Sequence, residues 1–566
     1  MKSNLQNADV LLKNGYIYTA DANERVAEAL AIKNDYIAAV GSNGDILNLI
    51  GPDTTVYDLD GMMVVPGMID SHLHPPAPKM MQSSLIYLSN PGSKEQMIAT
   101  IKDFICKNPS FPSFYGWGWK INLFDGEERM FGPKKETLDQ ICADRSVILQ
   151  SNDGHSMWAN SKALELSGLS KSSPDPQGGT IMRDPLTGEL WGTLTGTART
   201  LLPQQKFTKE QLTKAVKSFQ AYMHSLGYTG FFSAGTKPEN LQNIFKTLDD
   251  NQELKMWVRD SQRIDLNKNE TPAEQLDLLI DKNSEFNSEL YSFNTAKIFL
   301  DGVVEAGTAR LIEPYEKALG KGSNYHGMYY WDDMEALVAA IIKANSAGLQ
   351  VHIHSIGDQA TRDALDAYDK ALRKVPGEHR NSIAHLQLVR PEDLKRFYEL
   401  GVIANVQPYW HYKQSGWWKE VEYANIGERA EYQYPLKSLV TAGATLACSS
   451  DYPVVENPDP LLAIKAGITR NLYDTLSNGT AEIDDIDDER WLLNKNERIS
   501  LGVIIKSLTA NNAYALKIED VTGSIEAGKF ADLTIINENL FNLDPLDINR
   551  AKVVKTFFHG KIVYDA

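Results

Sequence analysis

The sequence has few cysteines, no long apolar run and no surplus of positive charge. Its three cysteines, Cys106, Cys142 and Cys448, lie far apart in a chain of 566 residues. This arrangement fits neither a disulfide framework nor a zinc-knuckle spacing, so it predicts reduced thiols and a cytoplasmic setting. No stretch of about 18 apolar residues occurs, and residues 1–13 are polar without the apolar core of a signal peptide. We therefore expect a soluble protein, although the sequence does not decide whether a signal segment was removed.

The charge balance is acidic, with a formal net charge of -17 at pH 7. Binding to nucleic-acid phosphates or to an anionic membrane surface requires clustered Lys and Arg, and the sequence has no such cluster. We therefore expect a small-molecule amide substrate and no nucleic-acid or membrane partner. A homodimer is compatible with these data.

The two ends of the chain have the pattern of β-strands, in which apolar and polar residues alternate between Gly and Asn turns. Such stretches cover residues 9–18, 29–40, 523–536 and 553–563. Neither end alone has enough strands to bury a core. We therefore expect residues 1–62 and 511–566 to form one small β-sandwich.

Between these ends, apolar strand-like runs alternate with helical patterns, which predicts an α/β fold with a (β/α)8 TIM-type barrel. The predicted strands cover residues 64–70, 228–234, 255–259, 295–300, 350–354, 382–386, 402–406 and 445–449. The barrel would take residues 63–75 and 226–510. Residues 76–225 are too many for a βα loop, so we expect an inserted subdomain over the barrel mouth that contributes to substrate choice.

The tripeptide His72-Leu73-His74 follows an apolar run that ends at Asp70. Side chains two apart on a strand point to the same face, so both imidazoles can bind one metal ion at the end of a strand. Parallel barrels build catalytic metal sites in this way, at the carboxyl ends of their strands. The alternative is a His-x-His pair with a structural or surface role, so the prediction depends on the rest of the chain.

Further metal-type side chains stand in or directly after later predicted strands. Lys297 lies inside the apolar strand 295–300, where a bare ammonium is costly to bury, so it is paired or modified. The alternatives are a lysine that snorkels from an edge or one that pairs with Asp301. Other strands end in His352, His354, His385 and Asp451. A single such residue is more often a core group, but their recurrence at strand ends favours a metal site.

With these motifs in this order, the chain resembles the metal-dependent amidohydrolase superfamily, in particular its amidohydrolase-3 branch, which includes N-substituted formamide deformylase-like enzymes. The motifs are residues 66–74 (PGMIDSHLH), 297–302 (KIFLDG), 354–358 (HSIGD), His385, 450–453 (SDYP) and 523–533 (GSIEAGKFADL). They cover nearly the whole chain. The ordered set is specific even though each piece is common.

The resemblance implies a set of metal ligands at the carboxyl ends of the barrel strands. The residues that match the family ligands are His72, His74, Lys297, His354, His385 and Asp451. In many relatives the lysine that matches Lys297 is carboxylated by carbon dioxide and bridges two divalent ions. The resemblance thus implies one or two ions of zinc or another divalent metal, and N6-carboxylysine at Lys297, which would turn a buried cation into an anionic ligand.

The chemistry expected from such a centre is hydrolysis of a carbon–nitrogen bond. Zinc-like ions lower the pKa of bound water toward neutrality and polarise the scissile carbonyl. Asp451 can take the proton of the water and pass it to the leaving nitrogen. The alternative for Asp451 is a cap or turn residue before Tyr452 and Pro453.

Five further residues are candidates for contact with the substrate. His155 stands in a segment that resembles an Asp-Gly-His segment of the family, and we expect it to hold the substrate carbonyl or to stabilise the oxyanion; the alternative is a histidine that organises its own turn. Trp158 belongs to an aromatic group that either lines an apolar pocket or fills the subdomain core. Tyr409 and Trp410 follow the seventh predicted strand, where barrel loops contact substrates. His352 faces the barrel interior by parity, as a substrate-facing residue or a support for a ligand.

Three functional classes stay open. The leading hypothesis is a metal-dependent hydrolase that cleaves a non-peptide amide or formamide bond of a small N-substituted substrate. The second is a metal-dependent deaminase or lyase on the same scaffold; deaminase relatives place a catalytic Glu close after the fifth-strand histidine, where this chain has Ser355, Ile356, Gly357 and Asp358. The third is a non-catalytic binding protein, which predicts lost ligands, and none is lost.

Overall fold

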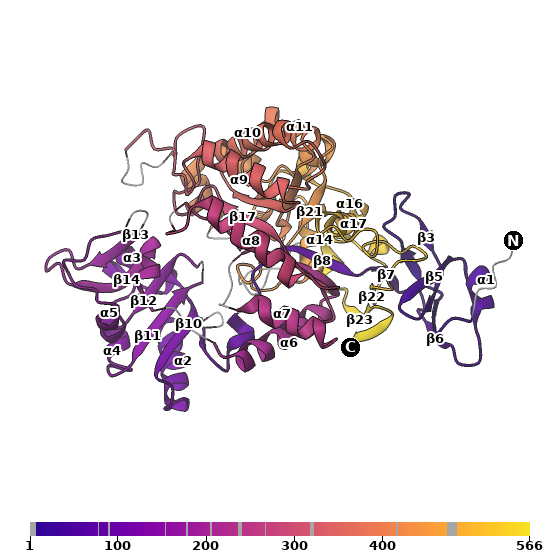
Figure 1. Cartoon of the computed structure of the whole chain (residues 1–566), viewed down its shortest axis with the longest axis horizontal. Helices are drawn as coiled ribbons and strands as arrows, with labels where there is room; N and C mark the ends of the chain where they lie inside the picture. Colours follow the sequence, from indigo (N-terminus) through magenta and orange to yellow (C-terminus); the bar gives the residue numbers. More distant parts are fainter. Residues whose placement is uncertain are drawn as a thin grey trace. The chain divides into compact units, whose positions relative to one another are not determined.

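A computed structural model describes residues 7–76, 78–88, 91–152, 154–176, 179–203, 207–235, 240–266, 268–316, 322–414, 417–472 and 484–566. The chain divides into two compact units, of which the first contains residues 1–75, 220–236 and 242–566 and the second contains residues 76–219 and 237–241. Figure 1 colours the chain by residue number, so that each unit can be followed. Within the described ranges, no helix has both the length and the apolar character needed to cross a membrane.

The first unit contains an eight-stranded parallel sheet that is nearly closed into a barrel. Its strands, in sheet order, are β8 (Met68–Leu73), β15 (Tyr228–Ser233), β16 (Trp257–Arg263), β17 (Tyr291–Phe299), β18 (Gln350–Ser355), β19 (Ser382–His385), β20 (Ile403–Val406) and β21 (Leu446–Cys448). Between the first and last strands, Ser71 Oγ donates a hydrogen bond to the carbonyl oxygen of Cys448 at 3.0 Å. Asn512 Nδ2 donates to the carbonyls of both Ile69 and Cys448. The predicted α/β barrel is confirmed.

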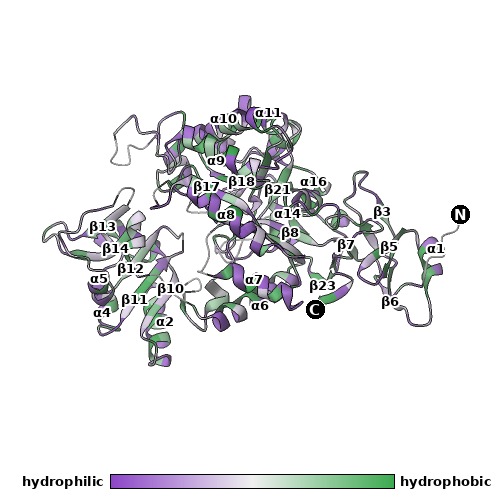
Figure 2. Cartoon of the chain, viewed as in Figure 1, coloured by the Kyte–Doolittle hydropathy of each residue, from purple (hydrophilic) through white to green (hydrophobic). Residues whose placement is uncertain are grey.

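Helices alternate with these strands. They include α7 (Leu241–Asp250), α8 (Pro272–Phe286), α9 (Met334–Ser346), α10 (Asp358–Lys374), α11 (Pro391–Glu399), α13 (Leu436–Thr441), α14 (Pro460–Thr469), α16 (Leu501–Leu508) and α17 (Ala510–Ala515). In α10 the buried residues Ala360, Ala364, Tyr368 and Ala371 recur every three or four positions, so one face packs while the other carries polar groups. Figure 2 shows this mixture of hydrophilic and hydrophobic residues on α10 and α11. Strands β8 and β18 are buried along their whole length, as expected for a covered parallel sheet.

The first barrel strand differs from its prediction. The predicted strand 64–70 covers parts of two strands: β7 (Met63–Pro66), which pairs with β2 (Tyr16–Tyr18) and β22 (Leu533–Ile536) in another sheet, and β8, which begins the barrel. Pro66 has no N–H to continue a ladder. Gly67 packs so closely against Thr229 that a Cβ would lie 2.2 Å from its Oγ1. The chain therefore changes sheets at these two residues, and His72 lies within β8 rather than after a strand.

Two smaller sheets are built from the ends of the chain, one from N-terminal strands alone and the other from strands of both ends. One has the order β5 (Tyr36–Gly41), β4 (Ala29–Lys33), β1 (Val10–Lys13) and β6 (Thr55–Asp58); the other has the order β24 (Lys561–Asp565), β23 (Val553–Phe558), β22, β7, β2 and β3 (Val26–Ala27). Strands of both sheets share one hydrophobic cluster that includes Leu12, Leu30, Val64 and Leu533. Because the core is shared, neither end of the chain alone supplies all of its apolar residues. The four predicted domain boundaries stay predictions.

The second unit contains a six-stranded sheet. Its order is β13 (Gly179–Arg183), β14 (Leu190–Gly196), β12 (Ser156–Ala159), β11 (Ser146–Ser151), β10 (Ser113–Trp119) and β9 (Ile86–Tyr87). Val147 and Leu149 of β11 share a cluster with Met97 of α2 (Lys94–Lys107), whereas Ile148 shares another with Leu164 of α5 (Ser161–Leu166). Because neighbouring residues of a strand point to opposite faces, each face of this sheet is covered by its own cluster.

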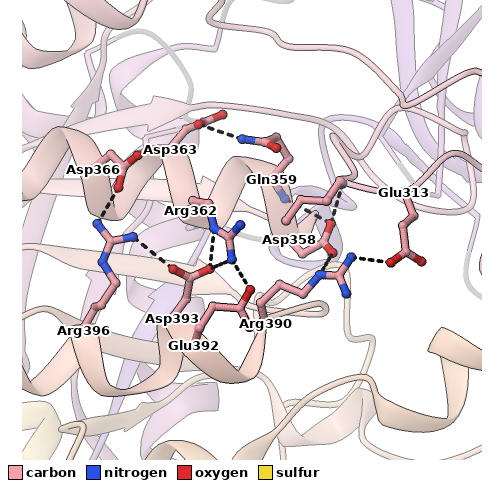
Figure 3. Close-up of polar contacts among 11 residues, drawn as sticks. Glu313, Asp358, Gln359, Arg362, Asp363, Asp366, Arg390, Glu392, Asp393 and Arg396 are labelled. Atoms are coloured by element: carbon pink, nitrogen blue, oxygen red, sulfur yellow. Dashed lines mark hydrogen bonds and ion pairs between the residues drawn. The ribbon is translucent and has the colours of Figure 1, made fainter.

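An ion-pair network connects α10 with α11 and with the segment after β17 (Figure 3). Its pairs are Arg362 with Glu392 and Asp393, Arg396 with Asp366 and Asp393, and Arg390 with Asp358 and Glu313. Asp358, the first residue of α10, also accepts a hydrogen bond from the N–H of Ile312 at 2.9 Å. The network therefore holds together the segments that leave the carboxyl ends of β17, β18 and β19.

Candidate metal centre

Three side chains from the two end strands of the barrel sheet meet at its carboxyl edge. In the described part of the chain, His72, His74 and Asp451 are the group whose possible ligand atoms all lie within 4.8 Å of one another. Asp451 Oδ1 lies 3.0 Å from His74 Nε2 and 3.4 Å from His72 Nε2. The backbones are also connected, because the N–H of Asp451 donates to His72 O and the N–H of His74 donates to Tyr452 O, both at 2.8 Å.

The charge state of this group suits a cation. Burial lowers the pKa of His72 well below its usual value, and the positive charge of Lys297 lowers it further. Burial by itself raises the pKa of the Asp451 carboxyl, but His74, His385 and Lys297 outweigh it, so that this pKa lies below its usual value. At neutral pH the site therefore presents a neutral imidazole and a carboxylate, which are the forms that bind metal ions.

His72 is oriented by a second histidine. His352 Nε2 lies 2.9 Å from His72 Nδ1, and His352 Nδ1 lies 2.6 Å from Ser382 Oγ. Both ring nitrogens of His352 thus contact protein groups, and His72 is left with Nε2 directed at Asp451. Two roles were predicted for His352, contact with the substrate and support of a ligand. The observed geometry matches support of the predicted ligand His72.

Two more histidines lie next to this group. The His385 ring is 5.0 Å from the His72 ring and 4.5 Å from the His354 ring, measured between centroids. His385 Nδ1 lies 3.0 Å from Gln407 Oε1. Because an amide oxygen only accepts, Nδ1 carries the proton and Nε2 keeps the lone pair that a metal needs. His354 Nδ1 lies 3.4 Å from Asp301 Oδ1.

Lys297 is fully buried in β17, and its Nζ has no hydrogen-bond partner within the described ranges. Burial lowers the pKa of Lys297 to about 7, against the opposing effect of the Asp451 charge. Neither alternative from the sequence is observed: the side chain does not reach solvent, and the Asp301 carboxylate instead accepts the N–H groups of Arg310, Ile356 and Gly357. A buried amine that makes no hydrogen bond within the described ranges, beside imidazoles and a carboxylate, fits a centre that holds a metal ion.

The backbone is strained at the same positions. His385, Leu386 and Asp451 have φ values of 80°, 52° and 58°, in the left-handed region that residues with a side chain rarely adopt. Such conformations cost of order 1–3 kcal/mol each and cluster at functional sites. Their occurrence at two of the six predicted ligands supports a functional rather than a structural role for these residues.

The other predicted substrate residues lie in different surroundings. The Trp410 ring is 5.8 Å from the His385 ring. Tyr409 is buried, with its hydroxyl 3.3 Å from that of Tyr228. In the second unit, Trp158 is fully buried in the core and donates from Nε1 to Lys134 O, which matches the core alternative. His155 precedes β12; its role and those of Tyr409 and Trp158 toward a substrate stay predictions, as do the homodimer and the cytoplasmic location.

Three supporting residues were not found from the sequence. Asp70 is fully buried in β8 and accepts the N–H groups of His72 and Ser450 at Oδ1. Gln407 donates from Nε2 to Asn405 Oδ1 and Ser449 Oγ, which fixes the amide that contacts His385. Asp301 was considered only as a partner of Lys297. The available signal was a polar residue in or directly after a predicted barrel strand, which marks a supporting role as well as a ligand.

The sequence of the chain matches known proteins over most of its length. The pattern of the amidohydrolase family matches residues 55–564. The chain is 30% identical over 570 residues to the protein LONG AFTER FAR-RED 3 of Arabidopsis thaliana, covering 98% of this chain and 92% of that protein. It is 28% identical to the protein YtcJ of Bacillus subtilis (strain 168), covering 97% of this chain and 98% of that protein. It is 24% identical to the N-substituted formamide deformylase of Arthrobacter pascens, covering 99% of each.

Solved structures show a similar fold. A metal-dependent hydrolase from Pyrococcus horikoshii OT3 superposes with a TM-score of 0.70 at 25% identity, covering 95% of this chain and 98% of that chain. An adenosine deaminase from Xanthomonas campestris, solved with bound zinc, has a TM-score of 0.53 at 13% identity, covering 99% and 94% of the two chains. At 13% identity the likeness concerns the fold alone.

Proposed function

This chain belongs to the amidohydrolase family, and we propose that it is a metal-dependent hydrolase of a carbon–nitrogen bond other than a peptide bond. The bond proposed is the amide or formamide bond of a small N-substituted substrate. The observation that carries this proposal is the meeting of His72, His74 and Asp451 at the carboxyl edge of the barrel sheet, next to the buried Lys297. The name of the N-substituted formamide deformylase, which matches along its whole length, supports the choice of bond.

The metal would be held by nitrogen and oxygen donors. The residues proposed as ligands are His72, His74, Lys297, His354, His385 and Asp451. Imidazole and carboxylate donors in this combination suit zinc, as one or two ions. When bound, the metal supplies Lewis-acid polarisation of the scissile carbonyl and lowers the pKa of water.

Asp451 is proposed to move the proton. Because its pKa lies below the usual value, the side chain is a carboxylate at neutral pH and can accept a proton from the attacking water. The carbon–oxygen bond then forms, the carbon–nitrogen bond breaks, and the same carboxyl group passes the proton to the leaving nitrogen. The products are an amine and a carboxylic acid, which is formic acid for a formamide.

Lys297 is proposed to react with carbon dioxide. Only the neutral amine is a nucleophile, and a pKa of about 7 makes about half of the Lys297 side chains neutral at neutral pH. The Nζ–carbon bond forms, a proton is released, and the product is a carbamate anion. This change would replace a buried amine by an oxygen ligand, and it would remove the positive charge that lowers the pKa of His72.

The test combines metal analysis with product analysis. The holoenzyme is assayed with N-alkylformamides and N-alkylacetamides, and formate or acetate is quantified together with the amine and any free ammonia. We expect metal-dependent release of the acid and the amine, and its loss in Asp451→Asn. Full activity after removal of the metal would overturn the proposal. Release of ammonia from an aminated ring, with no cleavage of any amide, would overturn it in favour of a deaminase.

A further inference from the structure

A network of buried side chains connects the seam between β8 and β21 with the proposed ligand His385. Asn405 Nδ2, in β20, donates to Ser71 O at 3.0 Å and to Ser71 Oγ at 2.9 Å. Asn405 Oδ1 accepts hydrogen bonds from Gln407 Nε2 and from Ser449 Oγ, both at 2.9 Å. Gln407 Oε1 lies 3.0 Å from His385 Nδ1. All five side chains are buried, so the network runs without interruption from a backbone carbonyl to a histidine ring.

The direction of the hydrogen bonds in this network follows from that one carbonyl. Ser71 O can only accept, so the Asn405 amide turns its NH2 group toward it. Asn405 Oδ1 then faces Gln407, whose amide presents its own NH2 group to that oxygen. Gln407 Oε1 is therefore the atom that faces His385, and Nδ1 of His385 carries the proton. In a neutral imidazole this leaves Nε2 with the lone pair that a metal ion needs.

The reversed arrangement would place acceptors against one another. If the Gln407 amide were turned over, its oxygen would stand 2.9 Å from Asn405 Oδ1. If both amides were turned over, the Asn405 oxygen would stand 3.0 Å from Ser71 O. Either change leaves buried acceptors without a proton between them, which is unfavourable. A reversed Gln407 would also donate to His385 Nδ1, and the proton would then occupy Nε2 and block metal binding.

The two amides are also held firmly. Both N–H groups of Asn405 Nδ2 are used by Ser71, and both N–H groups of Gln407 Nε2 are used by Asn405 Oδ1 and Ser449 Oγ. Ser71 Oγ donates its own proton across the seam to Cys448 O at 3.0 Å. Neither amide can turn without losing two hydrogen bonds. A buried polar network whose donors are all used in this way specifies a single arrangement.

We infer that Asn405 is a positioning residue that determines which ring nitrogen of His385 is free to bind the metal. Its side chain hydrogen-bonds to Ser71, Gln407 and Ser449, so its influence reaches His385 through Gln407. This inference rests on the proposed function and deepens it. The contacts that join the first and last barrel strands thereby also prepare one side of the metal centre.

The first measurement identifies the His385 tautomer in the full-length protein after removal of metal. Histidine is labelled with nitrogen-15, and the His385 signals are assigned by their loss in His385→Gln. The two ring nitrogens are distinct, because Nε2 couples to both ring protons whereas Nδ1 couples strongly to Hε1 alone. We expect the proton on Nδ1. A wild-type protein with the His385 proton mainly on Nε2 would overturn the inference without any variant of Asn405.

The second measurement compares two substitutions of Asn405. Asn405→Leu removes the oxygen that Gln407 Nε2 faces, so we expect both His385 tautomers and a loss of zinc affinity of roughly 10-fold, measured by competition with a chelator. Asn405→Asp is the conservative variant, because an aspartate presents an oxygen to Gln407 in either protonation state. It should keep the proton on Nδ1 and retain zinc affinity within about threefold of the wild type.

The matched control is Asn345→Leu, which removes a buried amide that contacts no proposed ligand. Asn345 of α9 exchanges hydrogen bonds of 3.1 and 2.9 Å with Asn381, the residue before β19. A general effect of removing a buried amide should appear in this control as well, whereas the changes in tautomer and in zinc affinity should not. If Asn405→Leu does not fold, as judged by thermal unfolding, Asn405→Val replaces it, since valine also lacks an acceptor and suits a strand.

Three outcomes with the variants would overturn the inference. They are an unchanged His385 tautomer in Asn405→Leu, an equal loss of zinc affinity in Asn345→Leu, and a loss of the Nδ1 proton in Asn405→Asp as large as that in Asn405→Leu.

The tautomer separates this inference from the proposed function. If the wild type binds no zinc, the proposed metal centre has failed, and the tautomers of the wild type and the Asn405 variants alone decide on Asn405. If zinc affinity follows the tautomer across the variants, the inference stands even when no amide is hydrolysed.

Discussion

His352 stands directly behind His72, with its Nε2 2.9 Å from His72 Nδ1. The two residues come from β18 and β8, which are not neighbours in the sheet, so the contact crosses the interior of the barrel. The His72 ring can turn only by breaking this contact, and its Nε2 is thereby kept toward Asp451. A residue that orients a ligand in this way influences metal affinity without touching the metal.

Replacing His352 by Phe should therefore weaken metal binding about 10- to 100-fold, as other losses of ligand support do. The measurement is a competition between the protein and a chelator for zinc, followed to equilibrium. His379→Phe is the control, because His379 contacts the carbonyl oxygen of Val375 and no proposed ligand. Unchanged zinc affinity in His352→Phe would contradict the supporting role.

Removing the Lys297 side chain should abolish most activity. We expect Lys297→Ala to lower kcat on the order of a hundredfold or more, because the proposed carbamate ligand could not form. A short carboxylic acid added to Lys297→Ala should restore part of the activity by occupying the vacated space, whereas a short alkylamine should not. The control is Lys343→Ala, because Lys343 lies on α9 and pairs with Asp277 of α8. Full activity of Lys297→Ala without any added acid would contradict the proposed ligand.

The stability of the metal-free protein should depend on pH through Lys297. Its pKa is about 7 when folded, against an ordinary value near 10.5, so between these values the unfolded chain binds one proton more than the folded chain. The free energy of unfolding contributed by this group therefore rises with pH in that range, by about 1.4 kcal/mol per pH unit. Below about pH 7 the amine is protonated in both states, and the dependence disappears.

This pH dependence is measured by urea unfolding of chelator-treated protein in buffers free of carbon dioxide. Lys297→Met is the comparison, because it keeps an unbranched side chain and cannot titrate. The difference in unfolding free energy between wild type and variant should change with a slope of about 1.4 kcal/mol per pH unit between pH 7 and pH 10, which corresponds to one proton. Parallel curves for the two proteins would show that the Lys297 pKa is not lowered.

The Arg390 side chain should contribute measurably to stability. Its loss in Arg390→Ala leaves the buried Asp358 carboxylate without its cation, and we expect a decrease of about 1–3 kcal/mol in the free energy of unfolding. Lys395→Ala, which breaks an exposed pair with Glu399 in the same helix, should cost less than about 0.5 kcal/mol. Chemical denaturation at low salt measures both. Equal effects of the two variants would show that the Arg390 ion pairs contribute no more to stability than an exposed ion pair does.

The barrel was predictable because covered parallel strands are apolar along their length, as in β21, where Leu446, Ala447 and Cys448 are all apolar and buried. The first strand was predicted with the wrong bounds, because residues 63–70 have the same largely apolar pattern whether they form one strand or two strands of different sheets. The change of sheet at Gly67 depends on how closely Thr229 approaches, and Thr229 is a residue of another strand. The local sequence pattern therefore does not show where the chain changes sheets.

The order of motifs along the chain, together with alternation along each strand, was enough to predict the barrel, and it also led to the proposed edge of the sheet and the proposed metal ligands. Only the tertiary structure decided which of His352 and His354 supports another histidine, since both point to the same side of β18 and differ in the neighbour that each meets. The same holds for Lys297, whose protonation is set by burial and by the charge of Asp451 on a distant segment. Short-range sequence patterns determine the secondary structure and the face to which each side chain points. Hydrogen-bond partners and pKa values instead depend on contacts between residues that can lie hundreds of positions apart.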